Sequence, residues 1–185
     1  MSFKTISMKP IVFIFGPSGV GKSHLYNLFE KQKFLCMQID TDSKKRTFAA
    51  NGFPSEWDTD FCKVRFDDFV GELQERLGNE HVGFVVSFPT THIFTLENCD
   101  LARQLGVTLV LLWGSEANCK QAAEIRINKK GGQFNLERYE RKNRQTFQLY
   151  SCPEYDIFRL EVFQVDGSRF SDEELLKQIA ILWKS

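Results

Sequence analysis

One segment of the sequence combines residue types and spacing that indicate nucleotide chemistry. It reads Gly16, Pro17, Ser18, Gly19, Val20, Gly21, Lys22 and Ser23, which matches the pattern GxxxxGK(S/T). Glycines in such a loop leave room for main-chain N–H groups to face the oxygens of a phosphate tail. Lys22 is expected to span the β- and γ-phosphates, and Ser23 is expected to ligate magnesium. We therefore expect ATP and Mg²⁺ to bind at this loop.

The loop needs a rigid strand before it and a helix after it, and the sequence supplies both. Residues Pro10 to Phe15 form an almost wholly apolar run, as in a strand buried on both faces. Residues Lys22 to Lys33 follow with apolar side chains at helical spacing. Similar patterns predict further strands at 34–39, 82–88, 107–113 and 160–165, and helices at 66–77, 95–105, 116–127 and 136–150. Strands that alternate with helices predict an α/β, three-layer αβα fold with a five-stranded parallel sheet.

Polar residues mark the expected starts of several helices. Thr95 precedes one helix as an N-cap, and Ser171 with Glu174 forms a capping box that opens a last helix. Asp42 or Ser43 is expected to cap a short helix that runs through Ala50.

Length, charge and cysteine usage exclude several classes of protein. The 185 residues predict a single domain over 1–185, with residues 1–9 as an N-terminal tail. The 24 Lys and Arg residues balance 24 Asp and Glu residues, which disfavours broad nucleic-acid binding because that requires a basic surface. No apolar run approaches the roughly 20 residues of a membrane span. Five widely spaced cysteines, an odd number, disfavour a disulfide framework and indicate a reducing, cytoplasmic setting.

Two acidic residues follow the second expected strand, where a ligand on the loop would meet them. One of Asp40 and Asp42 can hold magnesium while the other accepts a proton or hydrogen bond from a substrate hydroxyl. Both residues can instead cap a helix. The signals of a GTPase are incomplete, since residues 128–131 lack the Asp that reads guanine and the DxxG pattern at 68–71 lies within an expected helix.

With this loop opening a helix, and Asp40 and Asp42 ending the next strand, the chain resembles the small-metabolite kinases typified by shikimate kinase and gluconate kinase. That group belongs with adenylate kinase to the P-loop NTPase fold, and the resemblance covers roughly residues 10–184. It implies a mobile lid between the fourth and fifth strands, at about residues 127–137. It also implies that Asp40 takes part in catalysis from the magnesium shell and that Asp42 belongs to the acceptor site.

The resemblance implies roles for several arginines. By position, Arg126 lies beside the adenine or the phosphates, and Arg169 lies on the loop that edges the adenine. Arg144 corresponds to a family arginine that reaches toward the acceptor. Arg144 and Arg141, which precedes it by three positions, are expected to neutralise charge on the transferred phosphoryl group. Apart from the family pattern, Arg65 is a candidate contact for an anionic acceptor. The buried face of the 136–150 helix is expected to carry Leu136, Tyr139, Phe147 and Tyr150.

Some positions depart from the family pattern. The third strand leads into Ser87-Phe88-Pro89-Thr90 rather than the Gly-Gly-Gly turn of shikimate kinase, and Ser87 stands where adenylate kinase has an acidic residue. The expected lid also lacks the arginine–proline pair of shikimate kinase. We therefore expect an acceptor other than shikimate or AMP, and magnesium held by Ser23, Asp40 and water.

The expected function is ATP-dependent, magnesium-assisted transfer of a γ-phosphoryl group to a small metabolite or a nucleotide. The alternative is a nucleotide-binding regulatory module without transfer, which the missing acid at Ser87 favours. A nucleic-acid end kinase or NTP-driven remodeller is a third hypothesis, supported only by the Arg- and Lys-rich stretch from 126 to 144. The sequence names neither the acceptor nor the oligomeric state.

Overall fold

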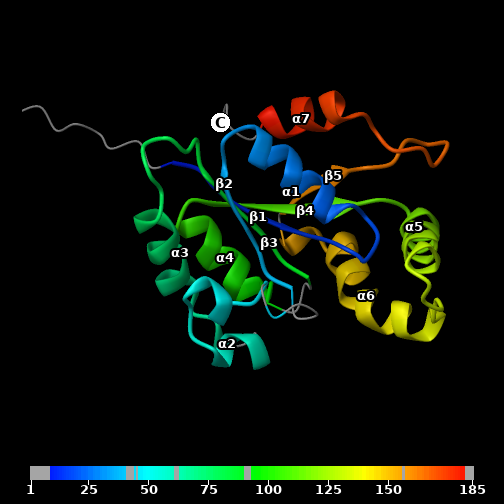
Figure 1. The fold of residues 1–185 in the computed structure, drawn as a ribbon, viewed down its shortest axis with the longest axis horizontal. Coiled ribbons are helices and arrows are strands. Elements are labelled where there is room, and N and C mark those ends of the chain that lie inside the picture. Colours follow the sequence, from blue (N-terminus) through cyan, green and yellow to red (C-terminus); the bar gives the residue numbers. More distant parts are fainter. Residues whose placement is uncertain are drawn as a thin grey trace, which may run out of the picture.

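A five-stranded parallel sheet organises the chain. The computed structural model describes residues 9–40, 44, 46–60, 63–89, 93–155 and 157–181. The strands are β1 Ile11–Phe15, β2 Leu35–Gln38, β3 Phe84–Ser87, β4 Val107–Trp113 and β5 Phe158–Glu161. They lie in the order β2-β3-β1-β4-β5, so β1 is central and pairs with β3 on one side and β4 on the other (Figure 1). The sheet expected from the sequence is confirmed.

Helices on both faces of the sheet complete the expected three layers. The helices are α1 Lys22–Lys31, α2 Glu56–Thr59, α3 Phe66–Glu75, α4 Leu96–Gln104, α5 Glu116–Lys129, α6 Leu136–Ser151 and α7 Asp172–Ala180, with 3-10 turns η1 Ala49–Asn51 and η3 Pro153–Tyr155. α1 and α7 pack on one face, and α3 and α4 pack on the other (Figure 1). Within the described part of the chain, every helix is too short or too polar to cross a membrane.

Aromatic packing around β1 accounts for much of the phenylalanine content. Phe13 and Phe15 point into one layer of the core, and Val12 and Ile14 point into the other, all of them fully buried. Phe13 packs edge-to-face on Phe88, with ring centroids 5.2 Å apart. Because β1 is enclosed on both faces, the glycine-rich loop that follows it begins from a rigid position.

Most expected elements are present, some with shifted ends. The strand expected at 107–113 has those bounds, and Thr95 and Ser171 cap α4 and α7 through their side-chain oxygens. The short helix expected to reach Ala50 is wrong, because the described residues before it form turns that lead into η1. Its expected cap, at residues 42 and 43, lies outside the described residues.

The fifth strand begins two residues earlier and ends four residues earlier than expected. It ends at Glu161, and the chain then turns back on itself through a bridge between Phe163 and Arg169. Val165, which extends the apolar run, is fully exposed in that turn. The expected strand at 160–165 is therefore wrong at its end, because an apolar sequence alone does not distinguish a strand from a turn that follows it.

The inward face of α6 is more polar than expected. Tyr139 is buried as expected, but Leu136 is 41% exposed. The side chain of Tyr150 lies outside the described residues. Asn143 and Thr146 take the buried positions instead. α5 runs on to residue 129, so only residues 130–135 separate it from α6, and the lid expected at about 127–137 stays a prediction.

Candidate active site

The glycine-rich loop curls around the side chain of its own lysine. The Lys22 ammonium donates hydrogen bonds to the carbonyl oxygens of Gly16 at 2.7 Å and Pro17 at 3.1 Å. Gly19 and Gly21 have φ angles of 87° and 108°, which glycine adopts without strain, and Gly21 is the residue before α1. A turn of this kind at the start of a helix offers main-chain N–H groups and a positive dipole end to an anion.

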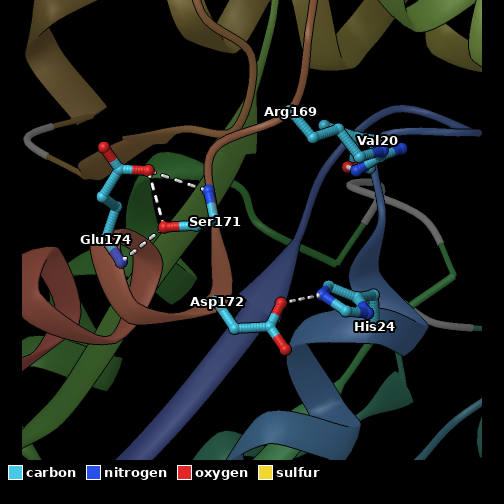
Figure 2. A network of polar contacts seen from close by, with 6 residues as sticks. All are labelled: Val20, His24, Arg169, Ser171, Asp172 and Glu174. Atoms are coloured by element: carbon cyan, nitrogen blue, oxygen red, sulfur yellow. Dashed lines mark hydrogen bonds and ion pairs between the residues drawn. The ribbon is translucent and has the colours of Figure 1, made fainter.

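Three later parts of the chain pack against this loop. At Gly19 a Cβ would lie 2.6 Å from a main-chain nitrogen of α5. From α6, the side-chain oxygen of Asn143 accepts a hydrogen bond from the N–H of Ser18 at 2.8 Å. From the segment before α7, Arg169 donates to the carbonyl oxygen of Val20 at 2.9 Å (Figure 2). The loop is therefore held from three directions as well as by β1.

The loop borders two adjoining hollows. The first is a cavity of about 650 Å³, whose walls come from the loop, the ends of β2 and β3, and helices α5 and α6. The second, of about 590 Å³, lies between α5 and the segment that joins β5 to α7. Ala122, Arg126 and Arg169 line both, so the two hollows meet at these residues.

The first cavity gathers most of the residues that the sequence singled out. Those lining it are Gly16, Ser18, Gly19, Gly21, Lys22, Ser23, Asp40, Arg126 and Arg169. Pro17 and Val20 are buried within the loop itself. Asp42, the expected acceptor contact, lies outside the described residues.

Three arginines expected at the site lie elsewhere in the structure. Arg141 and Arg144 are exposed on α6, and Arg144 lines a separate hollow beside Glu116. Arg65 has a side chain 68% exposed just before α3, where its Nε lies 3.1 Å from a carboxylate oxygen of Asp68. None of the three lines the cavity at the loop, and their expected roles stay predictions.

The cavity also contains polar residues that the sequence analysis missed. Lys142, Asn143 and Thr146 come from α6, and Gln38 comes from β2. Asn143 and Thr146 are only 3% and 2% exposed, so their polar groups lie in a confined space. Gln38 donates a hydrogen bond from Nε2 to the Ser23 hydroxyl at 3.3 Å. The helical spacing of Asn143 and Thr146 from the buried Tyr139 was their only signal in the sequence. This spacing does not indicate which groups the two side chains contact.

The surroundings of Lys22 disfavour its charged form. Burial is the main cause, and the positive charge of Arg126 is the second, and together they lower the Lys22 pKa from 10.5 to about 8. The carboxylate of Asp40 opposes this shift but is weaker. Burial raises the pKa of the Cys119 thiol on α5 to about 12, so this thiol is neutral at physiological pH. An anion bound at the loop would favour the charged form of Lys22.

The fold has counterparts among solved structures. The shikimate kinase from Aquifex aeolicus superposes with a TM-score of 0.56 at 16% identity, covering 94% of this chain and 96% of that one. The chain has the shikimate kinase fold. The shikimate kinase from Acinetobacter baumannii, solved in complex with shikimate, gives a TM-score of 0.54 at 18% identity over 98% and 97% of the two chains. The resemblance inferred from the sequence is thus confirmed at the level of the fold.

The same fold also occurs in a protein with a different name. The tunicamycin resistance protein of Deinococcus radiodurans superposes with a TM-score of 0.53 at 16% identity, covering 94% of this chain and 95% of that one. No protein-family model matches the chain, and no curated protein matches it in sequence.

Proposed function

We propose that this protein is a kinase that transfers the γ-phosphoryl group of ATP to a small molecule. The observation that carries the proposal is the extent of the first cavity, which runs from Lys22 and Ser23 on the loop to Ser87 and Phe88 at the end of β3. A module that only binds a nucleotide needs no space beyond the phosphates. The space beside the ends of β2 and β3 can hold an acceptor within reach of the γ-phosphate.

The nucleotide itself fits the two adjoining hollows. In this proposal the phosphates lie on the glycine-rich loop, and the base lies in the second hollow between α5 and the segment before α7. Phe163 lines that hollow and contributes apolar atoms to its wall. Arg126 lines both hollows, and in this proposal it contacts either the base or the phosphates.

Two lysines of the cavity, and an acidic residue that follows β2 in the sequence, have tasks in the proposed transfer. Lys22 neutralises negative charge on the β- and γ-phosphates, which grows in the transition state. Lys142 lines the cavity from α6, and we assign to it the role expected of Arg141 and Arg144. Asp42 follows β2 and is proposed to take the proton of the acceptor hydroxyl. That oxygen then bonds the γ-phosphorus as the bond to the β-phosphate oxygen breaks and ADP leaves.

Ser23 and Asp40 supply oxygen atoms that fit a magnesium ion. Both line the cavity, and the hydrogen bond from Gln38 fixes the position of the Ser23 hydroxyl. Magnesium favours hydroxyl, carboxylate, water and phosphate oxygens as ligands. The described residues contain no cluster of three or more His, Cys, Asp or Glu side chains suited to a metal ion, so the nucleotide would complete the site. When bound, magnesium offsets charge on the phosphates.

The test compares the wild-type protein with Lys22→Ala on a panel of small hydroxyl compounds and nucleoside monophosphates, with ATP and magnesium supplied. We expect one phosphorylated product by mass spectrometry from the wild type and none from Lys22→Ala, because the loop has lost its charge on the transferred group. Lys177→Ala is the matched control, since that lysine is exposed on α7 and pairs with Glu173. It should keep full activity.

Two results would contradict the proposal. Unchanged turnover by a folded Lys22→Ala variant would show that the loop does not act on the phosphates. Tight nucleotide binding by the wild type, with no product from any acceptor class, would instead favour the nucleotide-binding module. Salt-sensitive binding of oligonucleotides, followed by phosphorylation of their ends, would favour the nucleic-acid kinase.

A further inference from the structure

The chain between β5 and α7 folds into a tight turn rather than a loose connection. The N–H of Gln164 donates to the carbonyl oxygen of Ser168 at 2.7 Å, and Phe163 forms an antiparallel bridge with Arg169. The Asp166 carboxylate accepts hydrogen bonds from the main-chain N–H and the hydroxyl of Ser168, at 2.9 Å and 2.6 Å. This turn fixes the backbone of Arg169 before its side chain makes any contact.

The guanidinium of Arg169 is bound to the main chain of the glycine-rich loop. Its Nη1 donates to the carbonyl oxygen of Val20 at 2.9 Å (Figure 2). Its Nη2 donates to the carbonyl oxygen of Gly19 at 2.8 Å. The same group lies over the ring of Phe163, 4.8 Å from its centroid. It also fills the space beside Gly21, where a Cβ would come within 2.5 Å of Nη1. A planar guanidinium holds its two donors in a fixed geometry that matches two neighbouring carbonyls, whereas an ammonium is a compact charge on a flexible stem.

These contacts determine the direction of two peptide groups. In a trans peptide the C=O and the N–H point to opposite sides. Holding the carbonyls of Gly19 and Val20 on the side of Arg169 therefore turns the N–H groups of Val20 and Gly21 away from it. We infer that Arg169 is a positioning residue, which orients the main-chain N–H groups of the loop for a phosphate tail instead of serving chiefly as a contact for the base. The inference rests on the nucleotide binding in the proposed function.

A second contact steadies the same segment against α1. The Asp172 carboxylate lies 2.7 Å from Nε2 of His24, which joins the start of α7 to the helix that the loop opens (Figure 2). Ser171 and Glu174 close the capping box beside it. The segment before α7 thus contacts the loop through Arg169, and the start of α7 contacts α1 through Asp172. These contacts hold the Arg169 guanidinium in a fixed position.

The decisive experiment measures binding of ATP and of inorganic triphosphate by calorimetry to the wild type and to Arg169→Lys. Inorganic triphosphate has no base, so it reports on the loop alone. We expect Arg169→Lys to weaken both probes by a similar factor, roughly tenfold, because the fixed two-donor geometry at the Gly19 and Val20 carbonyls is lost. The wild type, with its two-donor guanidinium, is the reference. Arg169→Gln, which has no charge, should weaken both probes at least as much.

Arg159→Lys is the matched control. Arg159 also donates from Nη1 and Nη2 to two main-chain carbonyls, those of Ile157 at 3.2 Å and Cys152 at 3.0 Å, but it lies on β5 and outside both hollows. This variant should lower the melting temperature without changing the affinity for either probe. That contrast separates an effect on the loop from general destabilisation.

Several binding results would contradict this role of Arg169. Wild-type affinity of Arg169→Lys for triphosphate overturns it, and weaker binding of ATP alone makes Arg169 a contact for the nucleoside instead. If Arg169→Lys does not fold, Phe163→Leu removes the ring beneath the guanidinium and should weaken triphosphate binding several-fold, and unchanged binding there also overturns the inference. A wild type that binds neither probe refutes the proposed function itself.

Discussion

Raising the pH from 7 to 9 should weaken nucleotide binding through a single group, the Lys22 ammonium. Its pKa of about 8 makes it about nine-tenths charged at pH 7 and about one-tenth charged at pH 9. A bound phosphate tail favours the charged form, so binding at the higher pH must take up a proton. The expected loss is about tenfold in affinity between these two pH values.

The same pKa predicts how stability depends on pH. The folded pKa of Lys22 lies below its ordinary value of 10.5, so the unfolded chain binds more protons between pH 8 and 10.5. The contribution of Lys22 to the free energy of unfolding therefore rises across that window and is least favourable below pH 8. The difference from 10.5 to about 8 corresponds to at most about 3 kcal/mol of cost at neutral pH, which a bound phosphate would relieve.

Calorimetry at pH 9 in two buffers with different protonation enthalpies measures the proton uptake directly. Lys22→Arg is the control, because a guanidinium stays charged throughout this range and its affinity should not vary with pH. The comparison uses the change of affinity with pH in each protein, because the Lys22→Arg side chain has a different shape and alters the absolute affinity. The Cys119 thiol, with a pKa of about 12, adds no titration here. Equal wild-type affinity at pH 7 and pH 9, with no proton uptake, would refute the reasoning.

Two further substitutions test the packing of α5 against the glycine-rich loop and the capping of α7. Gly19→Ala should cost about 1–3 kcal/mol of stability and sharply weaken nucleotide binding, because φ is 87° and its Cβ would lie 2.6 Å from main-chain nitrogen of α5. Chemical denaturation checks the stability, with Gly71→Ala on α3 as a control that meets nothing within 4 Å and should stabilise the helix. Ser171→Ala should cost about 1 kcal/mol by removing the capping box of α7, and an unchanged denaturation midpoint would contradict that role.

The sequence predicted the parts of the fold that depend on local pattern. Apolar runs of strand length and a glycine-rich loop between a strand and a helix are visible within a few residues of each other. This is why β4 and the capping of α4 and α7 match their expected positions. The fifth strand was placed too late because Val165 is apolar in sequence but exposed in a turn.

The side chains that complete the candidate site were harder to predict because their partners are distant in sequence. Asn143 contacts Ser18 across 125 positions, so neither residue indicates the other locally. Neighbouring positions on α6 face different directions, so the orientation of the helix decides which cationic side chain lines the cavity. Lys142 lines it, and Arg141 and Arg144 do not. Residue type suggested the arginines, whereas the packing of the helix selects the lysine.

The strand order divides the proposed reaction between two halves of one sheet. On one side of β1, the ends of β2 and β3 bring Gln38, Asp40 and Ser87 to the cavity. On the other side, β4 leads into α5 and β5 leads toward Arg169. In the proposed reaction the acceptor space thus lies beside β2 and β3, and the base lies on the other side of β1, while α5 and α6 complete the cavity that both share. A substitution at Ser87 or Phe88 would therefore change the acceptor space without touching the hollow proposed for the base.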